Sequence, residues 1–298
     1  KAFRQAMASA IDKQSLIQGV FRDFAETHFT WQPRFSNFYP PEEDIPQFGV
    51  GDRYGSEVAR GLAEEAFEQS EYDYSFDGET MVDPDGNQVQ LSIYHSAGQE
   101  TEQLMGEFIA QELGNNLGID VTVEAIDGTR FNNEYWTNTD YPAPERNEDG
   151  EVTNVPDELV DTVNGEEVEW TAPTPTNPGP RNVTANEDWD MEIVFGLNTF
   201  PRNPLTNTAF FDGPTAYYNP VGYYPEFDAQ ALFDNAQQAT SEEELADALV
   251  ELFANLAEEQ PYIMLAFPDS TVGYREGLEG PIENFSKGWN LPAWRYEQ

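Results

Sequence analysis

Residue types that commonly perform catalysis or bind metal ions are scarce in this sequence, with the exception of carboxylates. There is no cysteine, which excludes disulfides, thiol nucleophiles and Cys-ligated metal sites. The two histidines, His28 and His95, have no second histidine or carboxylate at metal-ligand spacing, so each is interpreted as an ordinary loop or strand residue. Serine-hydrolase, phosphate-loop and dinucleotide motifs are also missing. We therefore predict no catalytic residue, no metal site and no cofactor.

Carboxylates dominate the charge of the chain, with 56 Asp+Glu against 14 Lys+Arg and a formal net charge of -42. Two of them could act as general acid and general base, but only a pocket that shifts one pKa would single out such a pair. The acids are dispersed over every segment, which favours a halophilic surface, because concentrated salt screens their mutual repulsion. An acidic patch for a basic partner would be clustered instead. No nucleic acid is expected as a partner, because phosphate contacts require basic residues.

A strand, a helix and a second strand follow one another in the first half of the chain. Val89 to Tyr94 alternates like a strand, and Ile119 to Glu124 alternates again. Between them, Thr101 can cap a helix that Gly118 ends. The apolar stripe of this helix is Leu104, Phe108, Ile109, Leu113 and Leu117. Such a βαβ unit predicts parallel strands with a right-handed crossover.

Four other segments of the first half have clear local patterns. Apolar residues from Phe3 to Val20 recur at helical spacing and predict one amphipathic helix. A second helix is expected from about Ser56 to Gln69. The proline-rich stretch from Phe29 to Val50 predicts an extended loop. Asp83 to Asn87 has the residues of a tight turn.

The second half begins with a stretch of a different kind. Thr137 to Asp188 is rich in Pro, Thr, Asn and acids, and is interpreted as a long acidic surface insertion with a hairpin around Asn164-Gly165. Beyond it, Asp190 to Gly196 and Tyr262 to Phe267 predict strands. Ser241 and Glu244 form a capping box before another helix. The fold class is therefore α/β.

Neither a membrane span nor a signal segment is expected, since no apolar run has the required length. The chain opens at Lys1, without Met, in the middle of a predicted helix. We expect that an N-terminal part of the parent protein, with any export signal, has been removed.

Four segments resemble, in the same order, the solute-binding proteins of peptide, dipeptide and nickel ABC importers, the family 5 type. Phe3 to Phe21 is similar to a family helix with an Ala-Ile-Asp-Arg core, and Gly118 to Glu124 to its Gly-Ile-x-Val strand. Asn219 to Asp228 resembles Asn-x-x-Gly-Tyr-x-Asn-Pro-Glu-Phe-Asp. Ala254 to Leu265 resembles a helix that runs into Pro-x-Ile-Pro-Leu. The resemblance covers nearly the whole chain except Thr137 to Asp188.

The resemblance implies a two-lobed binding protein that closes around its ligand. Residues 1–268 would form the second, C-terminal lobe, a periplasmic-binding-protein-like lobe with a mixed, mostly parallel sheet flanked by helices and an insertion at about 137–188. Residues 269–298 would return toward the missing first lobe. The implied partners are a small-molecule or peptide ligand, the missing N-terminal lobe of the same parent chain and an ABC permease in the membrane. The implied location is the outer face of the cell membrane, with a lipoprotein-type anchor in the missing part.

The same resemblance also implies a ligand site after the strand that ends at Gly196. Peptide-binding members carry an Asp there that pairs with the peptide amine, whereas Thr199 occupies the matching position and cannot supply that charge. Arg202 could pair with a ligand carboxylate, or equally form a surface salt bridge. Aromatic residues near the site could line a pocket or pack in a core. The residues expected at the ligand are Trp31, Asn198, Thr199, Phe200, Arg202, Tyr218 and Asn219.

A non-enzymatic receptor for small solutes, with di- or oligopeptides as the default ligand, is the leading interpretation. Sugar oligomers, metal chelates and other small anions stay open because Thr199 replaces the acid. One alternative is a carboxylate-dependent hydrolase of surface glycans, which would need a pocket with one raised carboxyl pKa. A cell-surface structural module is another, favoured by the acidic insertion and by two glycosylation sequons.

Overall fold

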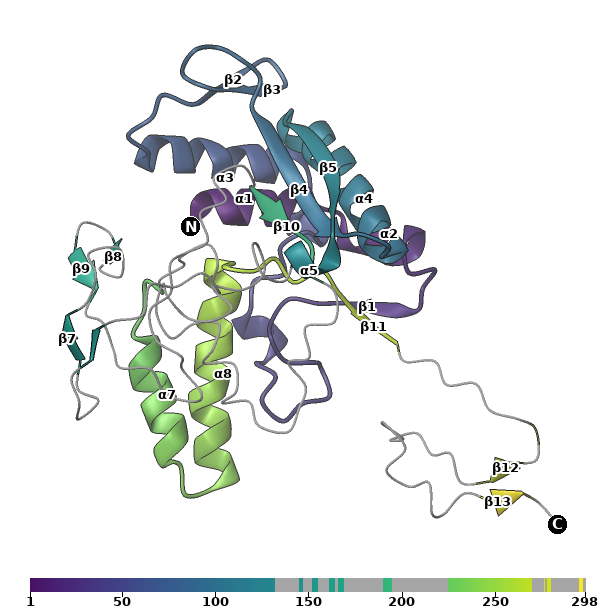
Figure 1. Cartoon of the computed structure of the whole chain (residues 1–298), viewed down its shortest axis with the longest axis vertical. Helices are drawn as coiled ribbons and strands as arrows, with labels where there is room; N and C mark the ends of the chain where they lie inside the picture. The colour runs from purple at the N-terminus through teal and green to yellow at the C-terminus, as the bar shows by residue number, and fades with distance from the viewer. Residues whose placement is uncertain are drawn as a thin grey trace. The chain divides into compact units, whose positions relative to one another are not determined.

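The computed structural model describes residues 1–131, 190–194 and 225–269, together with Glu276 and six short strands introduced below. Residues Lys1–Phe267 form one compact unit and Pro268–Gln298 form a second. Figure 1 shows the chain with its helices and strands labelled.

Three parallel strands form the central sheet of the first unit, in the order β10-β4-β5. β4 (Gln90–Ser96) pairs with β5 (Asp120–Ile126), and β10 (Met191–Glu192) pairs with the other edge of β4. Helix α4 (Glu100–Leu117) connects β4 to β5 and packs on the sheet, which confirms the predicted βαβ unit (Figure 1). A Cβ on Gly106 would lie 2.8 Å from a methyl group of Val123, so glycine permits the close approach of this helix.

The sequence predicted the C-terminal end of α4 correctly but not its N-terminal cap. The helix begins one residue before Thr101, and Gln99 is the N-cap, so the predicted Thr101 cap is wrong. Glu102, in the first turn, instead accepts a hydrogen bond from the Ser96 backbone N–H (2.9 Å). Gly118 ends the helix as predicted, with φ +65°, where a Cβ would collide with the backbone of Glu79. Leu104 is exposed, and Met105 is buried in its place.

The N-terminal segment is two helices rather than the single helix predicted from Phe3 to Val20. α1 (Ala2–Ala10) and α2 (Lys13–Gly19) are separated by Ile11, whose backbone is extended (φ -101°, ψ 116°). Asp12 then caps α2 by accepting from the backbone N–H groups of Gln14 and Ser15, both at 3.0 Å. Apolar spacing does not detect this break, because the apolar residues on both sides remain buried.

The main core lies between the sheet and helices α1, α3 and α4. α3 (Ser56–Gln69) has the predicted bounds and packs against α1 and α4. The buried core residues are Ala6, Met7, Ala10, Ile11, Leu16, Ala59, Ala63, Met81, Ile93, Met105, Ile109, Leu113, Leu117, Ile119 and Ile193. Because side chains alternate along a strand, Ile93 and Ile193 assign this core to one face of the sheet.

A second core lies within a helical hairpin. α7 (Ala229–Gln238) packs against α8 (Glu242–Glu259), and Trp31 is buried among their side chains (Figure 1). The Ser241 cap is confirmed, since its Oγ accepts from the Glu244 N–H (3.1 Å). The Glu244 side chain makes the return bond of the capping box, because its carboxylate accepts from the backbone N–H of Thr240 (2.8 Å). The helix begins where the sequence pattern predicted it.

Short elements complete the first unit. β2 (Ser75–Asp77) and β3 (Thr80–Val82) form an antiparallel pair, followed by the predicted tight turn, in which Asp83 accepts from the Asp85 and Asn87 N–H groups. Two 3₁₀ turns, η1 and η2, and the one-turn helix α5 have the bounds Glu42–Asp44, Gly51–Arg53 and Gly128–Arg130.

β1 (Ala25–Thr27) pairs with β11 (Ala266–Pro268). The strand predicted from Tyr262 to Phe267 is therefore wrong over most of its length. Residues 262–265 follow the left-handed end of α8 at Gln260 (φ +50°) and form no ladder of their own. Alternation of apolar residues alone could not show that this segment lacks a partner strand.

Three further antiparallel pairs stand between or after the longer described ranges. β8 (Asp161–Val163) and β9 (Glu166–Val168) flank Asn164-Gly165, which confirms the predicted hairpin. β6 (Glu145–Arg146) pairs with β7 (Val152–Asn154), and β12 (Leu278–Glu279) pairs with β13 (Arg295–Tyr296). Among the helices that the structure describes, none combines the length and apolar character needed to cross a bilayer.

Candidate functional site

The carboxyl ends of the three parallel strands meet at one edge of the sheet, which is where open α/β sheets bind ligands. β10 ends at Glu192, β4 at Ser96 and β5 at Ile126. The segment predicted to hold the ligand follows β10 directly. Six of the seven predicted ligand residues, namely Asn198, Thr199, Phe200, Arg202, Tyr218 and Asn219, lie outside the described residues.

Glu192 is the most unusual group at this edge. Its register partner on β4 is Tyr94, so it lies on the face of the sheet opposite to the main core. Its Oε2 is inaccessible to solvent and accepts no hydrogen bond. Burial raises the pKa of this carboxyl well above its ordinary value. A carboxylate in this position carries a desolvation cost that no described group offsets.

Tyr262 lies near enough to Glu192 for the carboxylate charge to affect the pKa of its hydroxyl. Burial, and secondarily the negative charge of Glu192, raise the pKa of the Tyr262 hydroxyl well above its ordinary range. The ring of Tyr262 meets Trp31 edge to face, with centroids 4.9 Å apart. Trp31 is 2% exposed and belongs to the core between α7 and α8. The one predicted ligand residue within the described ranges, Trp31, is therefore a core residue that packs against Tyr262.

Other polar groups at the same edge are satisfied within the protein. His95 is buried, and its Nδ1 lies 3.1 Å from the Ser96 carbonyl oxygen. Asp127 caps α5 by accepting from the backbone N–H groups of Thr129 and Arg130. Tyr94, Ile126 and Phe131 form a small buried cluster on the same face as Glu192. The edge thus combines a buried aromatic cluster with several carboxylates, among which Glu192 has an oxygen without a hydrogen bond.

A second buried ionisable group, Lys13, lies at the start of α2. It is fully buried, and its Nζ donates to the His28 carbonyl oxygen (3.1 Å) and lies 4.6 Å from the ring centroid of Phe29. Burial lowers the pKa of Lys13 to about 7. Burial, with smaller contributions from Lys13 and Arg34, lowers the pKa of His28 to about 4. Lys13 is structural, because its Nζ donates to a carbonyl oxygen inside the protein.

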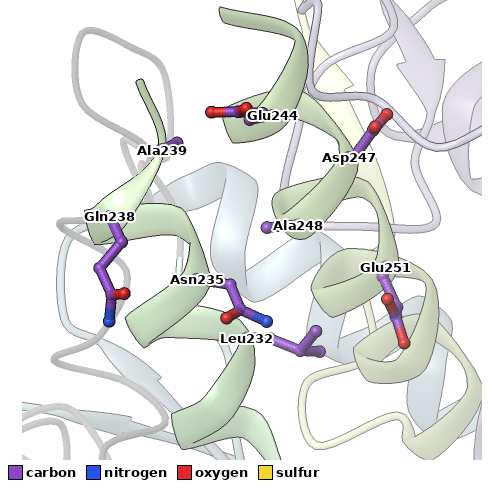
Figure 2. A pocket seen from close by; sticks show the side chains of 8 residues that line it. All are labelled: Leu232, Asn235, Gln238, Ala239, Glu244, Asp247, Ala248 and Glu251. Carbon is purple, nitrogen blue, oxygen red and sulfur yellow. The ribbon is translucent and has the colours of Figure 1, made fainter. Parts of the chain in front are cut away.

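A groove between α7 and α8 lies within the described residues (Figure 2). Its lining residues are Leu232, Asn235, Gln238, Ala239, Glu244, Asp247, Ala248 and Glu251. The groove is open to solvent along the hairpin, so it cannot enclose a small ligand as a binding pocket does. Among the described residues, no group of three or more His, Asp or Glu side chains is arranged to hold a metal ion.

Sequence reasoning did not identify Glu192 or Tyr262. A signal for Glu192 was present, since a glutamate interrupts the apolar residues of Asp190-Met-Glu-Ile-Val194 in a strand that was predicted to be buried. Tyr262 gave no such signal, because nothing in its local sequence places it beside a strand seventy positions earlier. Its role depends on the tertiary position of the segment after α8.

Parallel strands flanked by helices make this a periplasmic-binding-protein-like fold. The sequence model of the bacterial extracellular solute-binding proteins, family 5 (middle region), matches residues 1–169, more than half of the 298, and the chain belongs to that family. The family comprises transport binding proteins rather than enzymes.

Individual relatives are distant in sequence. The oligopeptide-binding protein AppA of Bacillus subtilis is 20% identical over 298 residues, which are 97% of this chain and 44% of AppA. The structure of B. subtilis AppA with a nonapeptide superimposes with a TM-score of 0.65 at 17% identity, covering 100% of this chain and 48% of that one. NikZ of Campylobacter jejuni in complex with Ni(L-His) gives a TM-score of 0.61 at 15% identity, covering 98% and 48%.

A third structure broadens the range of ligands. An oligopeptide ABC transporter binding protein of Thermotoga maritima with bound mannohexaose gives a TM-score of 0.58 at 16% identity, covering 90% of this chain and 41% of that one. The chain thus spans under half the length of the relatives it matches. At these identities the solved structures show the fold alone.

Proposed function

We propose that this chain is the ligand-binding second lobe of the extracellular substrate-binding component of an ABC importer, which takes up small solutes by closure of two lobes around the ligand. The observation that carries the proposal is the family match over residues 1–169, combined with a fold likeness that extends over the whole chain. Binding and closure require only that the ligand prefer the closed state, so no catalytic group is needed.

The proposed organisation follows from the length of the relatives. Because the chain spans 44–48% of the AppA sequence and structure, a first lobe of comparable size would come from the rest of the parent protein. Residues 1–268 would form the lobe and 269–298 the return toward its partner. Residues 137–188 would be an acidic insertion, although the family match extends into them, to residue 169. The whole protein would deliver ligand to an ABC permease, anchored as a lipoprotein at the outer face of the membrane.

Di- and oligopeptides are the proposed ligand class, with Trp31, Asn198, Thr199, Phe200, Arg202, Tyr218 and Asn219 as the proposed contact residues. The names of the relatives support peptides but do not define one ligand, since they include a nonapeptide, mannohexaose and Ni(L-His). Arg202 would pair with a ligand carboxylate through its two-pronged guanidinium. Trp31 would act through the core, because its side chain is 2% exposed.

The acidic composition supports a halophilic protein, so binding should be measured in multimolar sodium or potassium chloride. The test is thermal unfolding of the complete polypeptide that contains this chain, with trialanine, mannohexaose and nickel–histidine as parallel probes. A bound probe at a hundredfold excess over its Kd stabilises the protein by about 2.7 kcal/mol. A shift with any probe supports a solute receptor, and a shift with trialanine supports the peptide class. No shift with all three would contradict the proposal.

A further inference from the structure

Four aromatic side chains form a continuous row between the main core and the surface, at the junction of α3 and β2 (both labelled in Figure 1). Phe76 in β2 contacts Phe67 in α3, with ring centroids 5.5 Å apart. Phe67 stacks with Tyr74 (6.1 Å), and Tyr74 meets Tyr72 edge to face (6.4 Å). Phe67 and Phe76 pack against the main core, whereas Tyr74 is 37% and Tyr72 68% exposed. The aromatic row thus has an inner end at Phe76 and an outer end at Tyr72.

An arginine of this chain covers the inner end of the aromatic row. The guanidinium of Arg60 lies over Phe76, with its Cζ 4.0 Å from the ring centroid, and donates to the Gly78 carbonyl oxygen. Arg53 lies over the ring of Phe48 in the same way, at 5.2 Å. Stacking of a guanidinium on an aromatic ring is therefore a contact that this protein already uses.

The outer end of the row has no such cover within the part of the chain that the structure describes. None of the described Lys or Arg side chains lies over the ring of Tyr72 or Tyr74. Glu71 and Asp73 flank Tyr72 in the sequence, both are exposed, and neither forms an ion pair with a described cation. An exposed ring with a negative face and two carboxylates beside it in the chain is complementary to a planar cation with several N–H donors.

We propose that the outer end of the aromatic row, Tyr72 and Tyr74 with the flanking carboxylates, is a docking surface for an arginine-bearing segment of a partner protein. A guanidinium of the partner would stack on the outer rings as Arg60 stacks on Phe76. Its N–H groups would donate to the carboxylates of Glu71 and Asp73.

This docking surface is separate from the predicted ligand site. β2 pairs with β3, and the backbone of Glu79 between them lies against Gly118, directly before β5 begins. The surface is therefore near the amino ends of the sheet strands, whereas the ligand site is predicted at their carboxyl ends. The inference goes beyond the proposed function and does not depend on it.

The acidic composition favours a medium of concentrated salt, and such a medium selects arginine. At 1 M ionic strength the Debye length is about 3 Å, so attraction between separated charges is screened while stacking in direct contact persists. The lysine ammonium is more strongly hydrated and has no plane to stack on a ring. A neutral sugar polymer would leave the charges of Glu71 and Asp73 uncompensated.

The test measures calorimetric affinities of the complete polypeptide in concentrated salt for acetyl-Gly-Arg-Gly-Arg-Gly-amide. The same peptide with citrulline in place of arginine keeps the shape and removes the charge. The variant is Tyr72→Leu, and the matched control is Phe24→Leu, because Phe24 is 62% exposed and is not part of the aromatic row. We expect Tyr72→Leu to weaken binding of the arginine peptide about fivefold. Phe24→Leu should leave it unchanged, and the citrulline peptide should bind more weakly to every protein.

A second variant keeps both rings, so that a loss of binding cannot come from altered packing of the row. Glu71→Gln combined with Asp73→Asn should also weaken binding of the arginine peptide, and should leave the affinity for the citrulline peptide unchanged. Equal affinities for the two peptides, an unchanged affinity in Tyr72→Leu or no binding of the arginine peptide would each overturn the proposal. A lower molecular mass of Tyr72→Leu in sedimentation would assign the surface to a second copy of the chain, and would overturn it too.

Discussion

Lys13 and Glu192 are both ionisable side chains inside the same compact unit, but they differ in whether a hydrogen bond satisfies the buried polar atom. Lys13 is fully buried, but its Nζ donates to the His28 carbonyl and lies against the ring of Phe29. Glu192 has a buried oxygen with no hydrogen-bond partner. The Lys13 amine is thus satisfied within the protein, whereas Glu192 Oε2 is not. Satisfaction of polar atoms, rather than burial, distinguishes the two sites.

The two sites should also respond to pH in opposite directions. Lys13 has a pKa lowered from 10.5 to about 7, so the unfolded chain binds more protons between these values and stability rises with pH. Glu192 has a raised pKa, so the folded protein holds its proton longer and stability falls as pH rises above the ordinary glutamate range. Each of the following changes tests one part of this contrast.

The largest effect is expected for Lys13→Met, which keeps an unbranched side chain in this fully buried position and removes the titratable amine. The full difference of 10.5 to about 7 corresponds to about 5 kcal/mol in the pH dependence of unfolding. Between pH 7 and 10.5, the unaltered protein should gain this stability and the variant should not. Denaturant unfolding at a series of pH values in constant salt measures it. Parallel curves for the two proteins would show that Lys13 is not buried as a neutral amine.

His28→Gln should have the next largest effect, on the acid side. The pKa of His28 is lowered from 6.5 to about 4, so the unaltered protein should lose about 3 kcal/mol as the pH falls between these values. The variant should lack that loss. The same unfolding series measures it, with Lys13→Met as the control that keeps the acid limb. An unchanged acid limb in His28→Gln would contradict the burial of a neutral imidazole.

Glu192→Gln should stabilise the protein at neutral and alkaline pH, by about 1–3 kcal/mol, because a buried acceptor without a partner is no longer charged. The gain should shrink as the pH is lowered and Glu192 becomes protonated. Unfolding of Glu124→Gln provides the comparison for loss of a generic surface charge. A destabilised Glu192→Gln would indicate that the carboxylate has an internal partner, as Lys13 does.

The smallest effect is expected on the pKa of His28 in Lys13→Met. Burial is the main cause of its low pKa and the charge of Lys13 is a secondary one, so the pKa should rise by only a fraction of a unit. The chain has two histidines, which makes the NMR titration simple to assign by comparison with His95→Gln. A fall in the pKa would contradict the proximity of the two groups.

Local signals predicted the elements of the sheet region well. The βαβ unit, the bounds of α3, the Gly118 stop, the turn at Asp83 and the Ser241 cap all follow from spacing, capping residues or backbone conformation. Errors arose where a local pattern had two outcomes. Asp12 interrupts an otherwise continuous apolar stripe by capping a new helix, and residues 262–265 alternate without forming a strand, which begins only at Ala266.

The candidate site was less accessible from sequence. Family resemblance directed attention to Thr199 and Arg202, which lie outside the described residues, and to Trp31, which is a core residue. The group that stands out physically is Glu192, and its significance depends on a missing hydrogen bond. Only the tertiary arrangement of β10 and Tyr262 reveals that, because sequence shows which groups are polar but not which are left unpaired.

β10 has a further consequence for the order in which the protein assembles. It is a two-residue edge strand that rejoins the sheet long after β5 has ended at Ile126, held by the Ile193 N–H to the Tyr94 carbonyl and by the bonds between Asp190 and Ser92. Closing that long loop carries an entropic cost that the local βαβ unit avoids. The strand with the unpaired carboxylate should therefore dock last and open first. Amide exchange at Ile193 should therefore be faster than at the paired positions of β4 and β5.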